Sequence, residues 1–219
     1  MEALASELRD AHKVTVDILT ADMSKPGAPA DLFSQTREMG LQIDYLINNA
    51  GSEGPDLIKS RDWSRQDAYL RLMMTSVAGM CHEFMPSMLE RGYGRVLNVA
   101  SVAGRMTVGG DYSYGPTKAY LIALSKALSR SFKSEGVYTL ALCPGFTHTD
   151  FHESDKLTTM KAETPGFIWY SADVVIREGL AALEQGKEEC TSGRLYRFLV
   201  PILRQRWTQG LLKVLGVRL

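Results

Sequence analysis

The sequence contains little cysteine, no excess charge of either sign and no long apolar run, and each absence excludes a class of protein. Its three cysteines are widely spaced and form no CxxC pair, which argues against a disulfide framework or a zinc knuckle and is typical of a reducing compartment. Lys and Arg number 25 and are balanced by 25 Asp and Glu residues. Because non-specific nucleic-acid binding usually needs a basic field, we expect no nucleic-acid partner.

The chain also lacks the apolar segments that mark secretion or membrane insertion. Residues 1–13 carry alternating charges, and no uncharged apolar run is as long as a membrane-spanning helix would need, about 18 residues. We therefore expect a cytoplasmic protein. Residues 198–219 predict an amphipathic tail, because Leu, Ile and Val alternate there with Arg204, Arg206, Lys213 and Arg218. Packing on its own domain or on a partner subunit is favoured for this tail, with peripheral contact to a membrane as the alternative.

Short β-rich runs alternate with longer helical stretches along the whole chain. At 219 residues we expect one domain over 1–219. The alternation predicts an α/β fold with a parallel sheet covered by helices on both faces. Strands are expected at 14–19, 43–47, 95–100, 137–142 and 194–200, and helices at 2–12, 28–39, 64–91, 114–134 and 172–184, with an irregular flap over 147–170.

A tyrosine and a lysine stand four residues apart in a predicted helix. Tyr114 and Lys118 therefore share one helix face, and the ammonium is expected to lower the pKa of the phenol toward neutrality, where it exchanges protons efficiently. Ser101 ends a predicted strand thirteen residues earlier, at the strand end where parallel sheets bind ligands. Each feature alone has an ordinary structural explanation, a surface contact for the pair and a turn residue for the serine.

In their order along the chain these features resemble the short-chain dehydrogenase/reductase family. The resemblance covers nearly the whole chain and rests on Asp22, Asn48-Asn49-Ala50-Gly51, Ser101, Tyr114 with Lys118, and Pro144-Gly145-Phe146-Thr147-His148-Thr149. It implies a Rossmann-type, doubly wound parallel sheet and hydride transfer between a nicotinamide cofactor and a carbonyl or alcohol carbon.

The resemblance also implies roles for single residues. Tyr114 is the general acid in reduction, Ser101 orients the carbonyl, and Lys118 tunes the tyrosine and holds the nicotinamide ribose. Asp22 lies beside the adenine. The remaining cofactor contacts come from Asn48, Ala50 and Gly51, and from Pro144, Gly145, Thr147 and Thr149, with Gly145 and Thr149 at the nicotinamide end.

Two departures from the family pattern bear on function. The family has an asparagine, three residues before a glycine, that links the lysine to a water chain; here Ser76 stands three residues before Gly79 and is expected to relay protons less well. The family also begins with a strand, a glycine-rich turn, a helix and a second strand, about forty residues that have no counterpart here. Residues 14–19 would lie beside that first strand, so a chain without it is expected to expose a sheet edge and to bind cofactor weakly or not at all.

Other groups of residues carry weaker signals. His148 and His152 with Asp150 and Glu153 could suggest a metal site, but the polarity of the flap explains them and the set lacks a convincing third partner, so we expect no metal. Aromatic residues gather in the flap and are expected either to wall an apolar substrate pocket or to pack the flap on the domain; they are Phe146, Phe151, Phe167, Trp169 and Tyr170.

The sequence thus predicts an NADP- or NAD-dependent oxidoreductase of a moderately apolar ketone or secondary alcohol. NADP is slightly favoured, although the residues that select it follow a strand that has no counterpart here. By analogy with the family we expect a homodimer or homotetramer formed through the helices at 64–91 and 114–134. The alternatives are a catalytically impaired relative that binds or regulates, and a membrane-surface protein held by residues 198–219.

Overall fold

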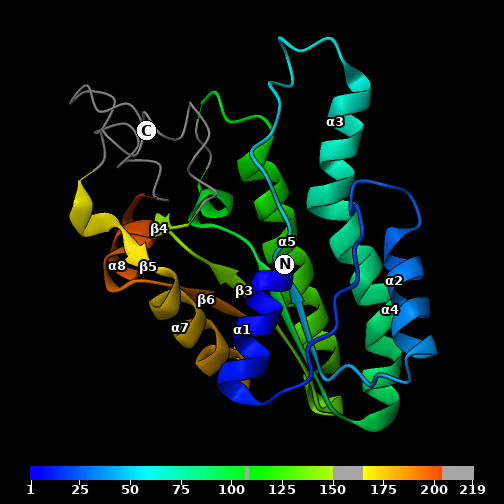
Figure 1. Ribbon diagram of the computed structural model, residues 1–219. Coiled ribbons are helices and arrows are strands. Elements are labelled where there is room, and N and C mark those ends of the chain that lie inside the picture. The colour runs from blue at the N-terminus through cyan, green and yellow to red at the C-terminus, as the bar shows by residue number, and fades with distance from the viewer. Residues whose placement is uncertain (107–108, 150–164, 204–219) are drawn as a thin grey trace.

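Four parallel strands form the central sheet of the computed structural model, which describes residues 1–106, 109–149 and 165–203 (Figure 1). The strands lie in the order β1-β2-β3-β6. Their bounds are Tyr45–Asn48 for β1, Gly94–Val99 for β2, Val137–Cys143 for β3 and Glu189–Thr191 for β6. Because all three pairings are parallel, the carboxyl ends of the strands meet at one edge of the sheet.

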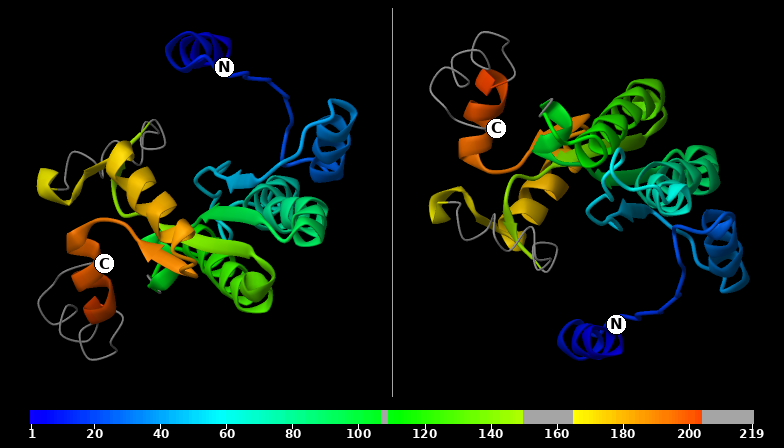
Figure 2. Two further views of the ribbon diagram at one scale, coloured as in Figure 1. Left: turned by 90° about the horizontal axis from the view of Figure 1, so that it is seen from below. Right: turned by 90° about the horizontal axis from the view of Figure 1, so that it is seen from above.

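Helices cover both faces of this sheet, which confirms the predicted Rossmann-type class. On one face lie α4 (Ser76–Arg91) and α5 (Tyr114–Phe132), with α2 (Ala28–Glu38) packed outside α4. The opposite face is covered by α7 (Ala172–Glu184) (Figures 1 and 2). The bounds of α7 agree with the prediction, and Gly92 ends α4 in a left-handed conformation that favours glycine.

The two faces of β3 show how the core is divided. Ala141 and Cys143 are fully buried beneath α5, and their small side chains let that helix approach the strand. Leu140 and Leu142 alternate with them and pack against α7 on the other side. This alternation holds α5, the helix that carries the Tyr-Lys pair, close to the sheet.

The strand predicted at 14–19 is wrong. These residues form no regular element and follow α1 (Glu2–His12), which lies apart from the sheet at the end of an extended segment (Figure 2). Val14 is half exposed. β-Propensity alone makes no strand, because a strand also needs a neighbour to receive its backbone hydrogen bonds, and none pairs with this segment in the described part of the chain.

The strand predicted at 194–200 is also wrong, because these residues belong to α8 (Arg194–Leu203). The last strand of the sheet is the short β6, which ends just before. Between them the Glu178 carboxylate accepts hydrogen bonds from the Ser192 hydroxyl and the Gly193 N–H, both at 2.9 Å, and Gly193 has a φ of 87°. The turn at Gly193 is followed directly by α8, whereas the apolar content of residues 194–200 favours a strand.

The long helix predicted at 64–91 is divided into three parts. It begins as α3 (Trp63–Leu70), widens into a π-helical turn, η1 (Arg71–Thr75), and continues as α4. Such turns rotate the following side chains and are frequent at functional sites. The remaining short elements are η2 (Val102–Arg105), η3 (Lys133–Glu135), β4 (Thr147–His148), η5 (Gly166–Ile168) and β5 (Tyr170–Ser171). Among the described residues, no helix is both long and apolar enough to span a membrane.

Candidate active site

Ser101 and Tyr114 meet at the carboxyl edge of the sheet. Ser101 follows β2 and caps η2, its hydroxyl accepting a hydrogen bond from the Ala103 N–H at 3.2 Å. Tyr114 is the first residue of α5, which the Asp111 carboxylate caps through the Gly115 N–H at 2.7 Å. The Ser101 hydroxyl lies close enough to the Tyr114 phenol for hydrogen bonding between them to affect the pKa of the tyrosine.

The pKa of Tyr114 runs against the expectation from the sequence. Burial raises the pKa of this phenol above its ordinary value, the Asp111 carboxylate raises it further, and the hydrogen bond with Ser101 opposes them. The predicted lowering by Lys118 is therefore wrong for this structure, because desolvation outweighs every favourable interaction of the phenolate. At neutral pH Tyr114 is protonated.

Lys118 is the buried cation of the site. It is 5% exposed, its Nζ donates to the Val99 carbonyl at 2.7 Å and lies 5.6 Å from the centroid of the Tyr114 ring. Burial lowers the pKa of Lys118 to about 8. Among the described residues the Val99 carbonyl is its hydrogen-bond acceptor, so two of its three N–H groups can serve a ligand.

Gly51 lies close to this lysine and to Met73. A Cβ at Gly51 would lie 3.3 Å from the Met73 Sδ and 3.8 Å from the Lys118 Nζ. The neighbouring Ser52 N–H donates to the same Met73 sulfur at 3.4 Å. Ala50 and Gly51 are exposed, so their backbone is open to a flat ligand placed against Lys118. This open backbone beside a buried ammonium fits the ribose and nicotinamide part of a dinucleotide.

Ser76, the predicted relay residue, forms its hydrogen bond within its own helix. It is buried, and its hydroxyl donates to the Leu72 carbonyl one turn earlier at 2.7 Å. Met73, in the π-helical turn, is 1% exposed; its sulfur accepts a hydrogen bond from the Ser52 N–H and lies near Gly51. Sequence reasoning missed Met73 because the family spacing, counted back from Gly79, selected Ser76 and gave the methionine no role. A relay role for Ser76 stays a prediction.

Asn48 belongs to a polar ladder beneath the site. Its side-chain amide donates to the Asn98 carbonyl oxygen at 2.8 Å, and the Asn98 amide donates to the Ser125 hydroxyl at 2.9 Å. Asn98 and Ser125 are fully buried. The ladder links β1, β2 and α5 and so fixes the elements that carry Gly51, Ser101 and Lys118 relative to one another.

The segment after β3, which carries further predicted cofactor contacts, packs against Tyr196 of α8. Pro144 and Gly145 follow the strand, and a side chain at Gly145 would collide with the ring of Tyr196. The Tyr196 hydroxyl accepts from the Phe146 N–H at 3.1 Å and donates to the Ile168 carbonyl at 2.9 Å. Thr147 is buried and donates to the Gly145 carbonyl at 3.1 Å.

The remaining predicted residues either lie in exposed turns or in the flap, or fall outside the described residues. Asp22 closes an exposed turn by accepting from the Ser24 N–H and hydroxyl, and Thr149 is exposed. Of the flap aromatics, Phe146 stacks on Trp169 at 5.0 Å and Phe167 is 75% exposed. Phe151, Asp150, His152 and Glu153 fall within the undescribed range 150–164. In the described ranges no group of three candidate metal ligands occurs.

Comparison with known proteins agrees with this geometry. The sequence profile of the short chain dehydrogenase family matches residues 1–159. The chain is 30% identical over 152 residues to an acetoacetyl-CoA reductase of Allochromatium vinosum, covering 68% of this chain and 62% of the relative. It is 32% identical over 158 residues to the oxidoreductase UcpA of Escherichia coli, covering 70% of this chain and 59% of the relative. The match thus spans less than two thirds of these relatives' own length.

Solved structures show the same fold. A short-chain dehydrogenase from Sphingobium yanoikuyae in complex with NADPH superposes with a TM-score of 0.77 at 25% identity, covering 97% of this chain and 81% of that one. A 7beta-hydroxysteroid dehydrogenase gives a TM-score of 0.77 at 23% identity, with coverage of 91% and 75%. With the sheet, the strand-end site and the sequence match in agreement, this chain belongs to the short-chain dehydrogenase family.

Proposed function

We propose that this chain carries the catalytic side of an NAD(P)-dependent reductase of carbonyl compounds. The observation that supports this most strongly is the meeting of Ser101, Tyr114 and Lys118 at one end of the sheet, beside the open backbone of Gly51. A reduced nicotinamide, when bound, supplies the hydride to the carbonyl carbon. The protein supplies orientation, a proton and charge stabilisation.

The roles follow from the chemistry of each group. Tyr114 is protonated at neutral pH because burial raises its pKa, so it enters the reaction as a proton donor to the carbonyl oxygen. Ser101 donates to the same oxygen and holds it in position. The Lys118 ammonium stabilises the phenolate that remains after proton transfer and offers its free N–H groups to the ribose hydroxyls.

The substrate class is a moderately apolar ketone or aldehyde. The stacked pair of Phe146 and Trp169 follows the turn after β3 and supports an apolar wall on the substrate side. The acetoacetyl-CoA reductase and the 7beta-hydroxysteroid dehydrogenase among the similar proteins are named for such carbonyl or alcohol groups.

Asp22, Asn48 and Ala50, together with the turn from Pro144 to Thr149, are proposed to complete the cofactor site. The preference between NADP and NAD, oligomerisation through α4 and α5, and a cytoplasmic location belong to the same proposal.

The test is consumption of reduced nicotinamide by the purified chain with a panel of apolar ketones and aldehydes. The assay uses NADPH or NADH at millimolar concentration. We expect turnover by the wild type and loss of at least about 100-fold in kcat for Tyr114→Phe. Failure of the wild type to oxidise either cofactor with every member of the panel would overturn the proposal.

A catalytically silent binding protein is the second candidate. Met73 favours it, because its thioether lies near Gly51, as Lys118 does, and a thioether accepts hydrogen bonds weakly and cannot pass a proton. In that case Tyr114→Phe leaves the binding of reduced nicotinamide unchanged, and neither protein turns over a carbonyl.

A further inference from the structure

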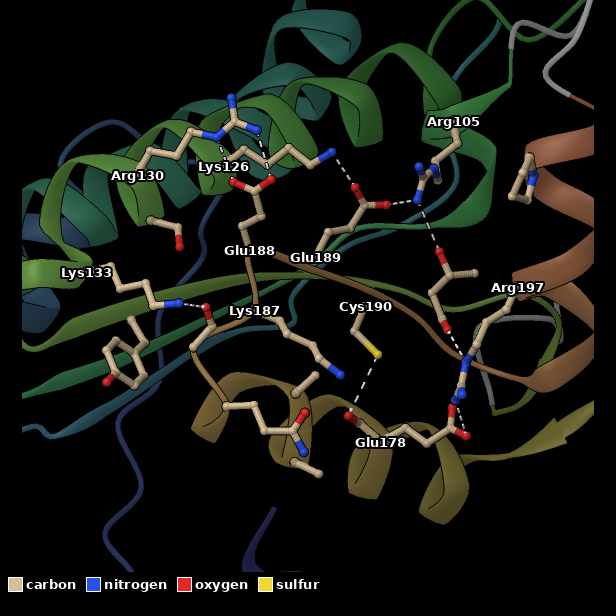
Figure 3. Close-up of a pocket in the computed structure, with 18 of the residues that line it drawn as sticks. Arg105, Lys126, Arg130, Lys133, Glu178, Lys187, Glu188, Glu189, Cys190 and Arg197 are labelled. Carbon is tan, nitrogen blue, oxygen red and sulfur yellow. Dashed lines mark hydrogen bonds and ion pairs between the residues drawn. The ribbon is translucent and has the colours of Figure 1, made fainter.

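Glu189 on β6 lies at the wall of a groove that is separate from the candidate active site. The groove has a volume of about 1310 Å³ and runs between α5, α7 and β6 (Figure 3). Three carboxylates line it, and each is ion-paired: Glu178 with Arg197, Glu188 with Arg130, and Glu189 with two cations. Glu189 is the least exposed of the three, with 10% of its side chain accessible, against 26% for Glu178 and 35% for Glu188.

One cation of Glu189 comes from the loop that holds Ser101. Arg105 ends η2 and pairs with the Glu189 carboxylate, and its Nη1 also donates to the Thr191 hydroxyl at 3.2 Å. Ser101 caps the same short helix four residues earlier. The arginine therefore ties the free end of the Ser101 loop to the sheet.

The other cation comes from the helix that holds Tyr114 and Lys118. The Lys126 Nζ lies 2.5 Å from the second oxygen of Glu189. Lys126 is two helical turns beyond Lys118 on α5, a rise of about 12 Å. A single carboxylate thus binds both elements of the proposed site (Figure 3).

We infer that Glu189 is a positioning residue, which sets the contact between Ser101 and Tyr114 by clamping η2 and α5 to β6. The inference rests on the proposed function for its effect on turnover. A nearly buried carboxylate between two cations holds them in a fixed geometry, and without its charge Arg105 and Lys126 repel each other. The loop then moves away from the helix, and the hydrogen bond between Ser101 and Tyr114 is lost.

The test compares Glu189→Gln with Glu188→Gln. Glu188 is the next residue, carries the same charge and pairs with the exposed Arg130 at 2.7 and 2.8 Å, but contacts neither η2 nor the catalytic side chains. We expect Glu189→Gln to lower kcat about tenfold with KM changed less than twofold, because orientation and not substrate contact is lost. Glu188→Gln is expected to keep both constants.

Titration of Tyr114 gives a readout that a merely structural role would not move. Loss of a nearby negative charge by itself lowers the pKa of a phenol, whereas loss of the hydrogen bond from Ser101 raises it. With carbon-13-labelled tyrosine and Tyr114→Phe to assign the signal, we expect Glu189→Gln to raise the pKa of Tyr114, in the same direction as Ser101→Ala. Arg105→Gln removes only the ion pair between η2 and Glu189 and is also expected to raise the pKa of Tyr114.

The inference is overturned if Glu189→Gln folds and matches Glu188→Gln in both readouts, or if the pKa of Tyr114 falls. Should Glu189→Gln fail to fold, Arg105→Gln decides by the same criteria. The tyrosine titration needs no turnover, so an inactive wild type contradicts the proposed function alone.

Discussion

The Lys118 ammonium donates to the main-chain carbonyl of Val99 at 2.7 Å, which ties α5 to the last residue of β2. This contact adds to the packing and hydrogen bonds that hold the Tyr-Lys helix against the strand that leads to Ser101. It also keeps a positive charge in the interior, where burial lowers the pKa of Lys118 from 10.5 to about 8. A cation held in this way costs stability, and the cost depends on pH.

Replacing Lys118 with methionine is expected to stabilise the chain at neutral pH. The lowered pKa corresponds to about 3 kcal/mol, from which loss of the Val99 hydrogen bond removes about 1 kcal/mol. Between pH 8 and 10.5 the unfolded chain binds the proton and the folded chain does not, so wild-type stability rises with pH and the advantage of Lys118→Met shrinks. Urea unfolding at several pH values measures this, with the exposed Lys187→Met as control. An advantage that does not change with pH would contradict the burial argument.

The same titration predicts a pH profile for catalysis. Lys118 must be charged to stabilise the Tyr114 phenolate, so kcat for reduction is expected to stay level below pH 8 and to fall above it. Arginine keeps its charge throughout this range, and Lys118→Arg is expected to move the fall to higher pH, whatever its absolute rate. Steady-state kinetics with saturating carbonyl substrate measures both profiles. An identical alkaline limb in the two proteins would assign the titration to another group.

Gly104 is expected to tolerate no side chain. A Cβ there would lie 2.6 Å from the Lys118 carbonyl carbon and 2.7 Å from the Ala119 nitrogen, both backbone atoms that cannot turn aside. Gly104→Ala is therefore expected to cost about 1–3 kcal/mol of unfolding free energy and to lower kcat by separating η2 from α5. Gly109→Ala, where a Cβ meets nothing within 4 Å, is the matched control. Equal melting temperatures for the two variants would show that the close approach is not essential.

Met73 offers a gain-of-function prediction. An asparagine at this position places an amide beside Lys118 and Gly51, where the thioether now lies. If proton supply to the lysine limits the proposed reaction, Met73→Asn raises kcat about threefold to tenfold, although a buried polar group costs about 1–3 kcal/mol of stability. Kinetics below the melting temperature of the variant test this. An unchanged or lower kcat in folded protein would mean that the sulfur does not restrict proton transfer.

The parts of the fold set by local pattern could be predicted from the sequence, and the parts set by neighbours could not. The apolar runs of β2 and β3 and the stretch from Tyr114 onward carry their own periodicity, and the structure confirms them within one or two residues. Residues 14–19 have the composition of a strand but no partner among the described strands. Residues 194–200 lie in a helix and not in the predicted strand; the turn before them is held by the distant Glu178 carboxylate, a contact that the local sequence does not reveal.

The candidate site divides in the same way. The approach of Ser101, Tyr114 and Lys118 follows from the ends of parallel strands and the four-residue spacing on a helix. The position of Met73 near Gly51 depends on tertiary packing, and the raised pKa of Tyr114 depends on burial. Neither property is visible in residue types along the chain.

Transfer of the labelled hydride tests the central claim most directly. Reduced nicotinamide carrying deuterium at both C4 positions is incubated with the chain and an apolar ketone, and the alcohol is analysed by mass spectrometry. We predict an alcohol one mass unit heavier, formed by the wild type and at least about 100-fold more slowly by Tyr114→Phe. An alcohol without deuterium, or equal rates for the two proteins, would contradict the assignment of hydride-transfer chemistry to Ser101, Tyr114 and Lys118.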